Sequence, residues 1–234
     1  MNIPPPKCIG FIMDGNRRWA QAEDTSTLAG HQRGAEVLQE SIRWVQNAHI
    51  PHVVYYAFTT ENWRRSEAEV SYLLELFRLQ IDSLREKQQE NVKKSEPPFR
   101  IRFIGRREDF DLDLREKMEQ AEAQNKKYPD EVTTVWIALS YGGRAEIVSA
   151  VNKAVAQKTC VDEETFSSLL WSADIPDPDI IVRTSGVQRL SNFLTWRSVY
   201  SELLFLDKHW PALTEVDFEG ILKAYESRER RRGA

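Results

Sequence analysis

The sequence contains few cysteines, no long apolar run and no excess of basic residues. Cys8 and Cys160 are the only cysteines among 234 residues, which is too few for a disulfide scaffold or a cysteine-rich metal site. No apolar stretch approaches the roughly 20 residues that cross a bilayer, and the N-terminus lacks the basic and apolar pattern of a signal peptide. The formal net charge of −4 gives no positive field for nucleic acid. These absences predict a cytoplasmic protein without a nucleic-acid partner.

Signature motifs of several enzyme classes are also absent. The chain has no Gly-x-x-x-x-Gly-Lys loop for nucleoside triphosphates and no Gly-x-Gly-x-x-Gly loop for dinucleotides. No serine elbow or cysteine–histidine pair stands out for acyl transfer. The sequence therefore argues against nucleotide hydrolysis, dinucleotide redox chemistry and acyl transfer.

Short apolar segments alternate with longer amphipathic ones. Strands are predicted at residues 7–13, 52–58, 99–104, 132–139, 179–182 and 203–206, and helices at 32–48, 66–94, 111–125, 143–157, 162–171 and 214–228. Asp162 is a plausible N-cap of its helix. This alternation predicts an α/β fold with a mainly parallel sheet and helices on both faces. No linker or repeat divides residues 1–234, which indicates a single domain.

Four of the predicted strands are followed by unusual polar segments. These are residues 14–19, 59–66, 140–144 and 183–192, and each mixes arginine or asparagine with small hydroxyl residues or glycine. Such groups suit phosphate oxygens, because arginine offers a planar fork of donors and glycine exposes backbone N–H groups. In parallel sheets, ligands bind beyond the carboxyl ends of the strands. Four such segments predict a site for two phosphorylated ligands.

Several single residues are candidates with competing explanations. Asp14 is either a Mg²⁺ ligand, which phosphates usually complete, or a helix cap or arginine partner. Glu202 is a second candidate ligand or a surface carboxylate. His31 binds phosphate or has a structural role, and Trp63 belongs to the core on spacing alone. Residue chemistry alone therefore predicts a two-phosphate, Mg²⁺-assisted enzyme beside an apolar helix.

The motifs closely resemble those of the undecaprenyl diphosphate synthase family of cis-prenyltransferases. The segments that carry the resemblance are residues 12–20, 30–34, 56–63, 140–144, 183–194 and 200–203. The resemblance implies a central six-stranded, mainly parallel sheet flanked by helices, with an apolar tunnel for the growing chain. It implies a Mg²⁺-dependent condensation of isopentenyl diphosphate with an allylic diphosphate, in a homodimer. A peripheral membrane contact for product release is also expected.

The resemblance implies roles for individual residues. Asp14 is expected to hold Mg²⁺ against the allylic diphosphate, and Glu202 to help hold the metal of isopentenyl diphosphate. Asn62 is expected to act as a catalytic residue that, together with Thr59, orients the reacting ends. The expected substrate-binding residues are Gly15, Asn16, Arg17, Arg18, Trp19, His31, Thr59, Thr60, Trp63, Arg65, Arg183, Arg189 and Ser191. The tail at residues 231–233 is expected to reach toward the partner subunit's site.

The chain also departs from the family pattern. Thr27 and Val187 stand where an arginine and a glutamate are usual, and Arg17 and Ser140 replace a common glycine and asparagine. These departures leave the primer and the product length open, including a short-chain synthase with the same chemistry. Two further alternatives are a catalytically silent partner subunit, which would lack the intact phosphate segments, and a phosphohydrolase, which would need a water-activating base.

Overall fold

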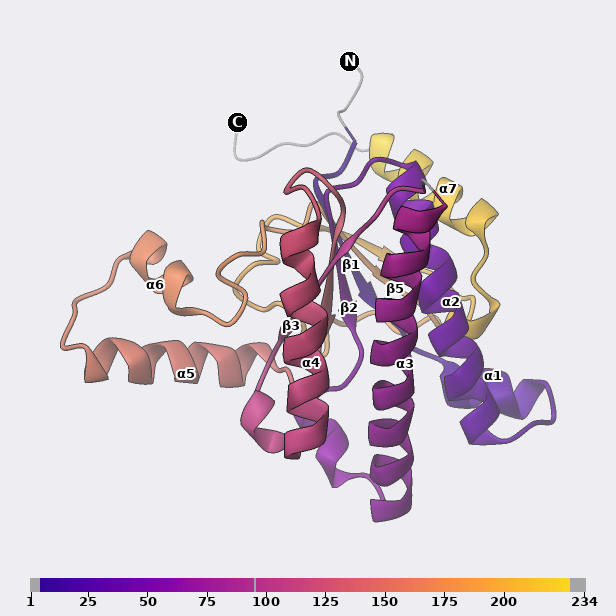
Figure 1. Cartoon of the computed structure of the whole chain (residues 1–234), viewed down its shortest axis with the longest axis horizontal. Helices are drawn as coiled ribbons and strands as arrows, with labels where there is room; N and C mark the ends of the chain where they lie inside the picture. Colours follow the sequence, from indigo (N-terminus) through magenta and orange to yellow (C-terminus); the bar gives the residue numbers. More distant parts are fainter. Residues whose placement is uncertain (1–4, 95, 228–234) are drawn as a thin grey trace.

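Six parallel strands form the centre of the protein in the computed structural model, which describes residues 5–94 and 96–227 (Figure 1). The strands are β1 (Cys8–Ile12), β2 (His52–Tyr56), β3 (Arg100–Ile104), β4 (Thr134–Ala138), β5 (Ile180–Arg183) and β6 (Glu202–Phe205). Their order is β3-β4-β2-β1-β5-β6, and each neighbouring pair is parallel. The predicted six-stranded sheet is confirmed. Residues 231–233, with their predicted contact to a partner, lie outside the described residues.

The structure describes seven α-helices, five of which begin at a residue whose side chain caps them. The seven are α1 (Asn16–Ala22), α2 (Thr27–Asn47), α3 (Glu67–Lys93), α4 (Leu112–Gln124), α5 (Gly143–Ala156), α6 (Glu163–Leu169) and α7 (Glu215–Glu226). Side chains of Ser66, Asp111, Asp162 and Thr214 accept hydrogen bonds from backbone N–H groups of the first turn, which satisfies donors that a helix leaves free. The predicted cap at Asp162 is confirmed. No helix within the described residues is long and apolar enough to cross a membrane.

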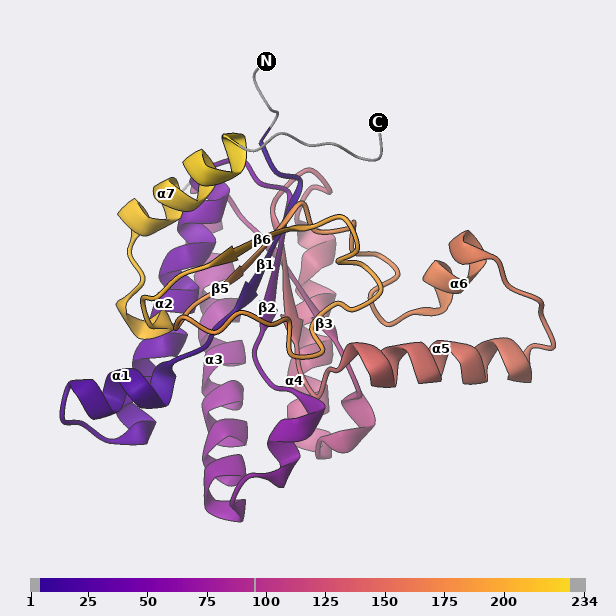
Figure 2. The same ribbon diagram turned by 180° about the vertical axis from the view of Figure 1, so that it is seen from behind.

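The two faces of the sheet are covered differently. Helices α2, α3, α4 and α7 pack on one face (Figure 1). The other face packs mainly against two irregular segments, residues 170–179 before β5 and residues 184–201 between β5 and β6 (Figure 2). Phe193 of the second segment is buried and stacks on Tyr56 at 4.7 Å. Helices α5 and α6 pack on each other and project away from the sheet. The prediction of helices on both faces therefore holds for one face only.

The start of the chain contains a helix that the sequence pattern did not predict. Helix α1 has a single buried residue, Ala20, so it carries no apolar stripe for a periodicity argument to detect. Helix α2 begins at Thr27 rather than at residue 32, because the Ser26 side chain caps it by accepting from the Ala29 N–H. Its first turn buries only Gly30 and therefore gave no periodic signal. Both missed segments lie beside the cavity described below.

The edge strand β3 is protected by side chains from the end of α4. The Asn125 side chain accepts from the Ile101 N–H at 2.9 Å and donates to the Ile101 carbonyl at 2.6 Å. Glu122 accepts from the Phe103 N–H at 3.0 Å. These contacts occupy the backbone groups that an open edge would offer to another chain. They also hold α4 firmly beside the sheet.

A glycine at the end of β3 provides a test of this packing. Gly105 has φ +119°, and a Cβ there would lie 1.9 Å from the Leu139 carbonyl oxygen. We expect Gly105→Ala to lower the free energy of unfolding by at least about 2 kcal/mol, from the backbone strain and the overlap. Urea unfolding measures this. Gly220→Ala is the control, because it lies in α7 with open space around it and should gain roughly 0.5–1 kcal/mol; equal effects would contradict the interpretation.

Candidate active site

The four polar segments meet at one edge of the sheet. They follow β1, β2, β4 and β5, which are adjacent in the order β4-β2-β1-β5. Backbone bonds join the segments, from the Gly143 N–H to the Asn192 carbonyl at 2.7 Å and from the Thr60 N–H to the Tyr141 carbonyl at 3.0 Å. The Thr184 hydroxyl donates to the Asp14 carbonyl at 2.6 Å. The predicted gathering of the four segments is confirmed.

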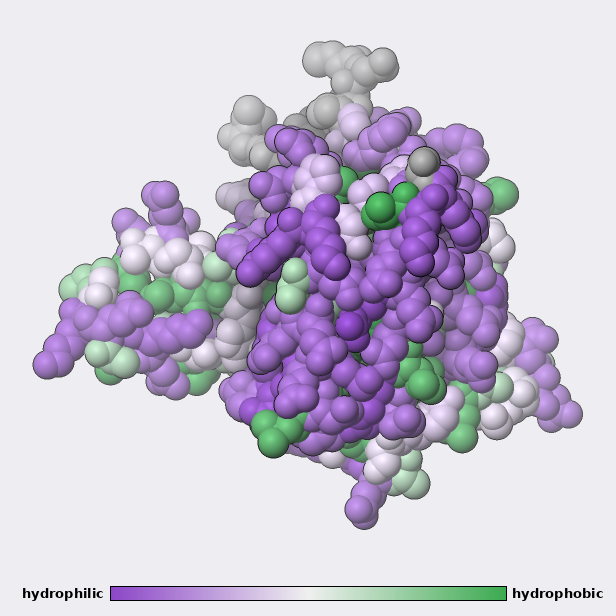
Figure 3. Space-filling model, viewed as in Figure 1, coloured by the Kyte–Doolittle hydropathy of each residue, from purple (hydrophilic) through white to green (hydrophobic). Residues whose placement is uncertain are grey.

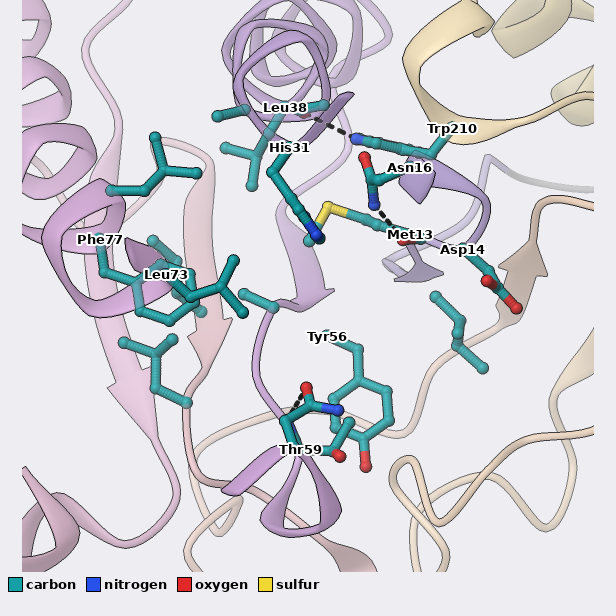
Figure 4. Close-up of a pocket in the computed structure, with 18 of the residues that line it drawn as sticks. Met13, Asp14, Asn16, His31, Leu38, Tyr56, Thr59, Leu73, Phe77 and Trp210 are labelled. Atoms are coloured by element: carbon teal, nitrogen blue, oxygen red, sulfur yellow. Dashed lines mark hydrogen bonds between the residues drawn. The ribbon is translucent and has the colours of Figure 1, made fainter. Parts of the chain in front are cut away.

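A cavity of about 730 Å³ opens beneath these segments, on the helical face of the sheet. Its inner wall is apolar and comes from α2, α3, β3 and β4. The apolar lining includes Leu38, Leu73, Leu76, Phe77, Ile81, Leu84, Phe103, Ile137 and Leu139. Figure 4 shows Leu73 and Phe77 on one side of the cavity and Asp14, Asn16 and Trp210 on the other. The site thus combines a polar mouth with an apolar chamber.

Asp14 and Arg183 form a hydrogen-bonded ion pair at the mouth. The Arg183 guanidinium donates to Asp14 Oδ2 at 2.7 Å, and Arg18 donates to Asp14 Oδ1 at 3.1 Å. Burial alone would raise the pKa of the Asp14 carboxyl, but the bond and charge of Arg183, followed by those of Arg18, outweigh burial and hold the pKa below its ordinary value. Asp14 is therefore an ionised carboxylate at neutral pH.

Arg183 also organises the loop that follows β5. One of its terminal nitrogens donates to the Ser191 hydroxyl at 2.6 Å and to the Arg189 carbonyl at 2.5 Å. The residue is 4% exposed, so most of its donors serve the protein itself. Arg189 is more exposed, lines the cavity and donates to Ser191 at 3.2 Å. Arg189 is consequently the freer of the two arginines for an incoming anion.

The turn between β1 and α1 packs against Ser185, from the predicted segment 183–192, and against His209, which the sequence did not single out. Gly15 has φ +104°, and a Cβ there would lie 2.7 Å from His209 Nδ1 and 2.8 Å from Ser185 Oγ. Ser185 and His209 are themselves 2.8 Å apart and hydrogen-bonded. Arg18 donates to the Ser185 carbonyl at 3.1 Å. Gly15 thus allows close packing of this turn, and of its two neighbours only Ser185 lies in a segment that the sequence singled out.

His31 lies in the cavity wall near a cluster of charges. Figure 4 shows it pointing from α2 toward Met13. Its Nε2 has no hydrogen-bond partner within the described residues and lies 3.9 Å from Glu69, which contacts Arg17 and Arg65. Burial, followed by the charge of Arg65, lowers the pKa of His31 to about 4. Neutral His31 therefore faces the cavity with one nitrogen available to a ligand.

The short 3₁₀ helix η1 (Thr60–Arg64) carries Asn62 to the mouth. Asn62 Oδ1 accepts from the Thr59 N–H at 3.0 Å, which leaves its amide N–H₂ as the group for a ligand. Trp63 Nε1 donates to Ser140 Oγ at 2.8 Å, and Ser140 donates to Asp109. Trp63 therefore anchors this turn from outside the described cavity lining, in agreement with the core interpretation.

The cavity lining separates the predicted site residues into two groups. Those that line it are Asp14, Asn16, His31, Thr59, Asn62, Arg65, Arg183, Arg189 and Ser191. Gly15, Arg17, Arg18, Trp19, Thr60, Trp63 and Glu202 are not among the described lining residues. Glu61 also lines the mouth, where Asn192 donates to it at 3.1 Å. Sequence reasoning did not single out Glu61 or Glu69, since an acidic residue carries no phosphate signal.

Glu202 lies at the opposite end of the sheet from Asp14. The register pairs Glu202 with Ile180, and Ile180 with Ile9, whereas Asp14 follows the last residue of β1. The two predicted metal ligands therefore do not meet within one protomer. Among the described residues, no group of three or more His, Cys, Asp or Glu side chains is arranged to hold a metal. A cation at this mouth would have to share Asp14 with oxygens of its substrate.

Comparison with known proteins identifies the family. The profile described as "Putative undecaprenyl diphosphate synthase" matches residues 12–233. The chain belongs to this prenyltransferase family. An isoprenyl transferase of Thermotoga maritima is 42% identical, covering 97% of each chain. A tritrans,polycis-undecaprenyl-diphosphate synthase (geranylgeranyl-diphosphate specific) of Pyrococcus abyssi is 38% identical over 97% of this chain and 87% of its own.

Solved structures of this family share the fold. Lavandulyl diphosphate synthase of Lavandula x intermedia, in complex with dimethylallyl diphosphate, superposes with a TM-score of 0.90 at 29% identity, covering 98% of this chain and 99% of that chain. A probable undecaprenyl diphosphate synthase of Campylobacter jejuni gives 0.82 at 29% identity, covering 99% and 100%. The fold and the enzyme class, prenyl transfer between isoprenyl diphosphates, are thereby established. The resemblance stated from the motifs is confirmed.

The buried His31 makes stability depend on pH. Its pKa is about 4 in the folded chain against an ordinary 6.5, so between these values the unfolded chain binds more protons and stability falls as pH falls. From pH 7 to pH 5 the loss due to His31 should be about 2 kcal/mol. Urea unfolding at both pH values measures this loss. Between pH 7 and pH 5, the free energy of unfolding should fall by about 2 kcal/mol less in His31→Gln than in the parent. The exposed His49→Gln is the control; an equal pH response in parent and His31→Gln would contradict the assignment.

Proposed function

We propose that the protein condenses isopentenyl diphosphate with an allylic diphosphate and forms a Z double bond. The allylic primer is farnesyl diphosphate, and the product is a Z-polyprenyl diphosphate such as undecaprenyl diphosphate. Breaking the allylic C–O bond yields a delocalised cation and free diphosphate. The alkene of isopentenyl diphosphate then attacks the cation, and the adduct loses a proton. Family membership and the arginine-rich mouth above an apolar cavity support this proposal.

The observation that carries the proposal is the join between the polar mouth and the apolar cavity. A prenyl diphosphate has a highly charged head and an apolar tail, and the site has matching halves in contact. We assign the allylic diphosphate to the α1 and α2 side, where Asn16, His31 and Arg65 line the mouth. Isopentenyl diphosphate is assigned to Arg189 and Ser191. Arg183 lies between the two, bonded to both Asp14 and Ser191.

Asn62 is proposed to orient the reacting ends through its free amide N–H₂. The departing diphosphate is proposed as the acceptor of the proton, since it is a strongly basic anion released next to the adduct. The arginines stabilise the negative charge that develops as the C–O bond breaks. A phosphohydrolase fits this site less well. The mouth of the site leads into an apolar chamber, whereas hydrolysis needs a water molecule and a base that activates it.

Asp14 fits the needs of a divalent cation. Mg²⁺ is usually held by one or two carboxylates together with substrate phosphates, and Asp14 is an ionised carboxylate at the mouth. When bound, Mg²⁺ would neutralise charge on the leaving diphosphate. Glu202, at the other end of the sheet, is not assigned to this cation within one protomer. The location of the enzyme is proposed to be cytoplasmic, with a membrane contact when the apolar product leaves.

Helix α5 supports the proposed homodimer. Val148, Val151 and Val155 lie along one side of α5 and are 59%, 45% and 70% exposed. They belong to the arm that projects from the body, where apolar side chains gather on the surface in Figure 3. An exposed apolar stripe of this kind is typical of an interface. Sedimentation equilibrium tests the oligomeric state.

The main test measures condensation directly. We expect the protein to incorporate labelled isopentenyl diphosphate into farnesyl diphosphate with Mg²⁺, to stop with EDTA and to recover when Mg²⁺ is restored. Asp14→Asn should lower turnover by at least about a hundredfold, because several kcal/mol of charge stabilisation are lost. Asp113→Asn, at a surface ion pair with Arg78, is the control. Full turnover in a folded Asp14→Asn protein contradicts the metal assignment, and phosphate release without condensation indicates a phosphohydrolase.

Product length tests the proposed tunnel. Ala57 lines the cavity just beyond β2, and a larger side chain there would narrow the path of a growing chain. We expect Ala57→Leu to shorten the product while the first condensation persists, with a stability loss of about 1–3 kcal/mol from overpacking. Mass spectrometry of the products and thermal unfolding separate the two effects. The exposed Ala123→Leu on α4 serves as the control; an unchanged product from folded Ala57→Leu removes Ala57 from the tunnel.

A further inference from the structure

Glu69 binds two arginine side chains beside the mouth of the cavity. Arg17 donates to Glu69 Oε1 at 3.1 Å through Nε and to Oε2 through a terminal nitrogen, in a two-pronged pair. Arg65 donates to Glu69 Oε1 at 2.9 Å. The Glu69 side chain is 13% exposed, whereas that of Arg17 is 54% exposed. The carboxylate is thus held between an outer arginine and an inner one.

Only the inner arginine faces the cavity. Arg65 lines it, and Arg17 is not among its described lining residues. Arg17 belongs to α1 and Glu69 to α3, so their pair links two elements on either side of the mouth. The guanidinium fork of Arg17 is directed at Glu69, and a direct phosphate contact would require this pair to break. Arg17 is therefore poorly placed to take over the role of the arginine that the family usually has at position 27.

We propose that Arg17 and Glu69 are positioning residues that hold Arg65 in place to bind the allylic diphosphate. The inference rests on the proposed function and adds to it the residues that orient its phosphate-binding arginine. Glu69 is fixed by the two-pronged contact with Arg17, and it fixes one end of the Arg65 guanidinium in turn. Arg65 keeps its remaining donors for the ligand.

Electrostatics explains why Arg65 needs such a partner. The charge of Asp14 also acts on Arg65, and a flexible arginine without a fixed counter-ion would be drawn toward that carboxylate. Pairing of Arg65 with Asp14 would add a third guanidinium to a carboxylate that already accepts from Arg183 and Arg18. Ordering a long side chain in advance also lowers the entropy lost on binding. Glu69 thus keeps Arg65 near the mouth and away from Asp14.

A double-mutant cycle distinguishes a positioning role from direct contact. The variants are Arg17→Gln, Arg65→Gln and the double variant, with Glu69→Gln as a fourth. The quantities measured are KM for farnesyl diphosphate, KM for isopentenyl diphosphate, kcat, and the Kd of inorganic pyrophosphate by calorimetry. Arg78→Gln is the matched control. Arg78 also lies on α3 and also forms ion pairs, but its partners are Asp111 and Asp113 at the start of α4. Circular dichroism and thermal unfolding check the fold of each variant.

We expect Arg65→Gln to raise KM for farnesyl diphosphate roughly ten- to a hundredfold, as for a lost charge-assisted contact. Arg17→Gln should raise it by roughly fivefold to tenfold in the parent and less than about twofold in Arg65→Gln, because coupled residues are not additive. KM for isopentenyl diphosphate should change little. Glu69→Gln should weaken pyrophosphate binding, and Arg17→Lys should restore part of the loss.

Other outcomes overturn the inference. An equal effect of Arg17→Gln with and without Arg65 would show that Arg17 contacts the ligand itself. Tighter pyrophosphate binding by Glu69→Gln would show that Glu69 competes with the ligand rather than orienting its arginine. If Arg17→Gln is unfolded, the same cycle is run with Arg17→Lys. A parent that binds pyrophosphate with the expected coupling but does not condense the two substrates would overturn the proposed function alone.

Discussion

The ion pair between Asp14 and Arg183 is the contact on which the arrangement of the site depends. Asp14 follows β1 and Arg183 ends β5, which are neighbours in the sheet. The same guanidinium holds the loop after β5 through Ser191 and the Arg189 carbonyl. Removing a charge from a buried pair leaves its partner uncompensated, so this pair constrains both residues strongly. The Asp14 carboxylate and the loop that carries the exposed Arg189 are therefore fixed relative to each other before any ligand binds.

The apolar half of the site comes from incomplete packing between helices and sheet. Helix α3 contributes Leu73, Ile81 and Leu84 to the hydrophobic core, and the same three side chains also line the cavity. A helix packed fully against the strands would fill this volume, as protein interiors normally do. Here α3 is held at its N-terminal end by the charges around Glu69 and near its other end by Gln88, which donates to the Phe99 carbonyl at 2.7 Å. Polar contacts also hold the middle of α3, where Gln39 donates to Gln80 at 2.7 Å, so the helix is fixed along its length beside the apolar chamber.

The sequence was sufficient to predict elements with a strong local signal. The long helix α3 begins one residue after its cap Ser66, and α4 and α7 likewise follow predicted starts at Asp111 and Thr214. The polar segments were also predictable, because strand ends in a parallel sheet share one edge. Helix α1 was missed because it buries one residue. Glu69 was missed because its pair with Arg17 joins residues 52 positions apart in the sequence. Glu202 precedes its strand, so the same rule places it at the opposite edge of the sheet from Asp14, where the structure has it.

The order of the strands explains why the site can bind both the charged end and the apolar end of one ligand. β1 and β2 are central, so the mouth above them is bordered by the segments after β4 and β5 on either side. Charged groups gather there because parallel strands all end at that edge. The helical face directly below is apolar, because strands buried on both faces carry apolar residues throughout. A ligand whose charged end sits above β1 must therefore direct its apolar end down along α2 and α3. Under the proposed function, a chain that grows at its diphosphate end would advance into this chamber while each new condensation takes place at the same mouth.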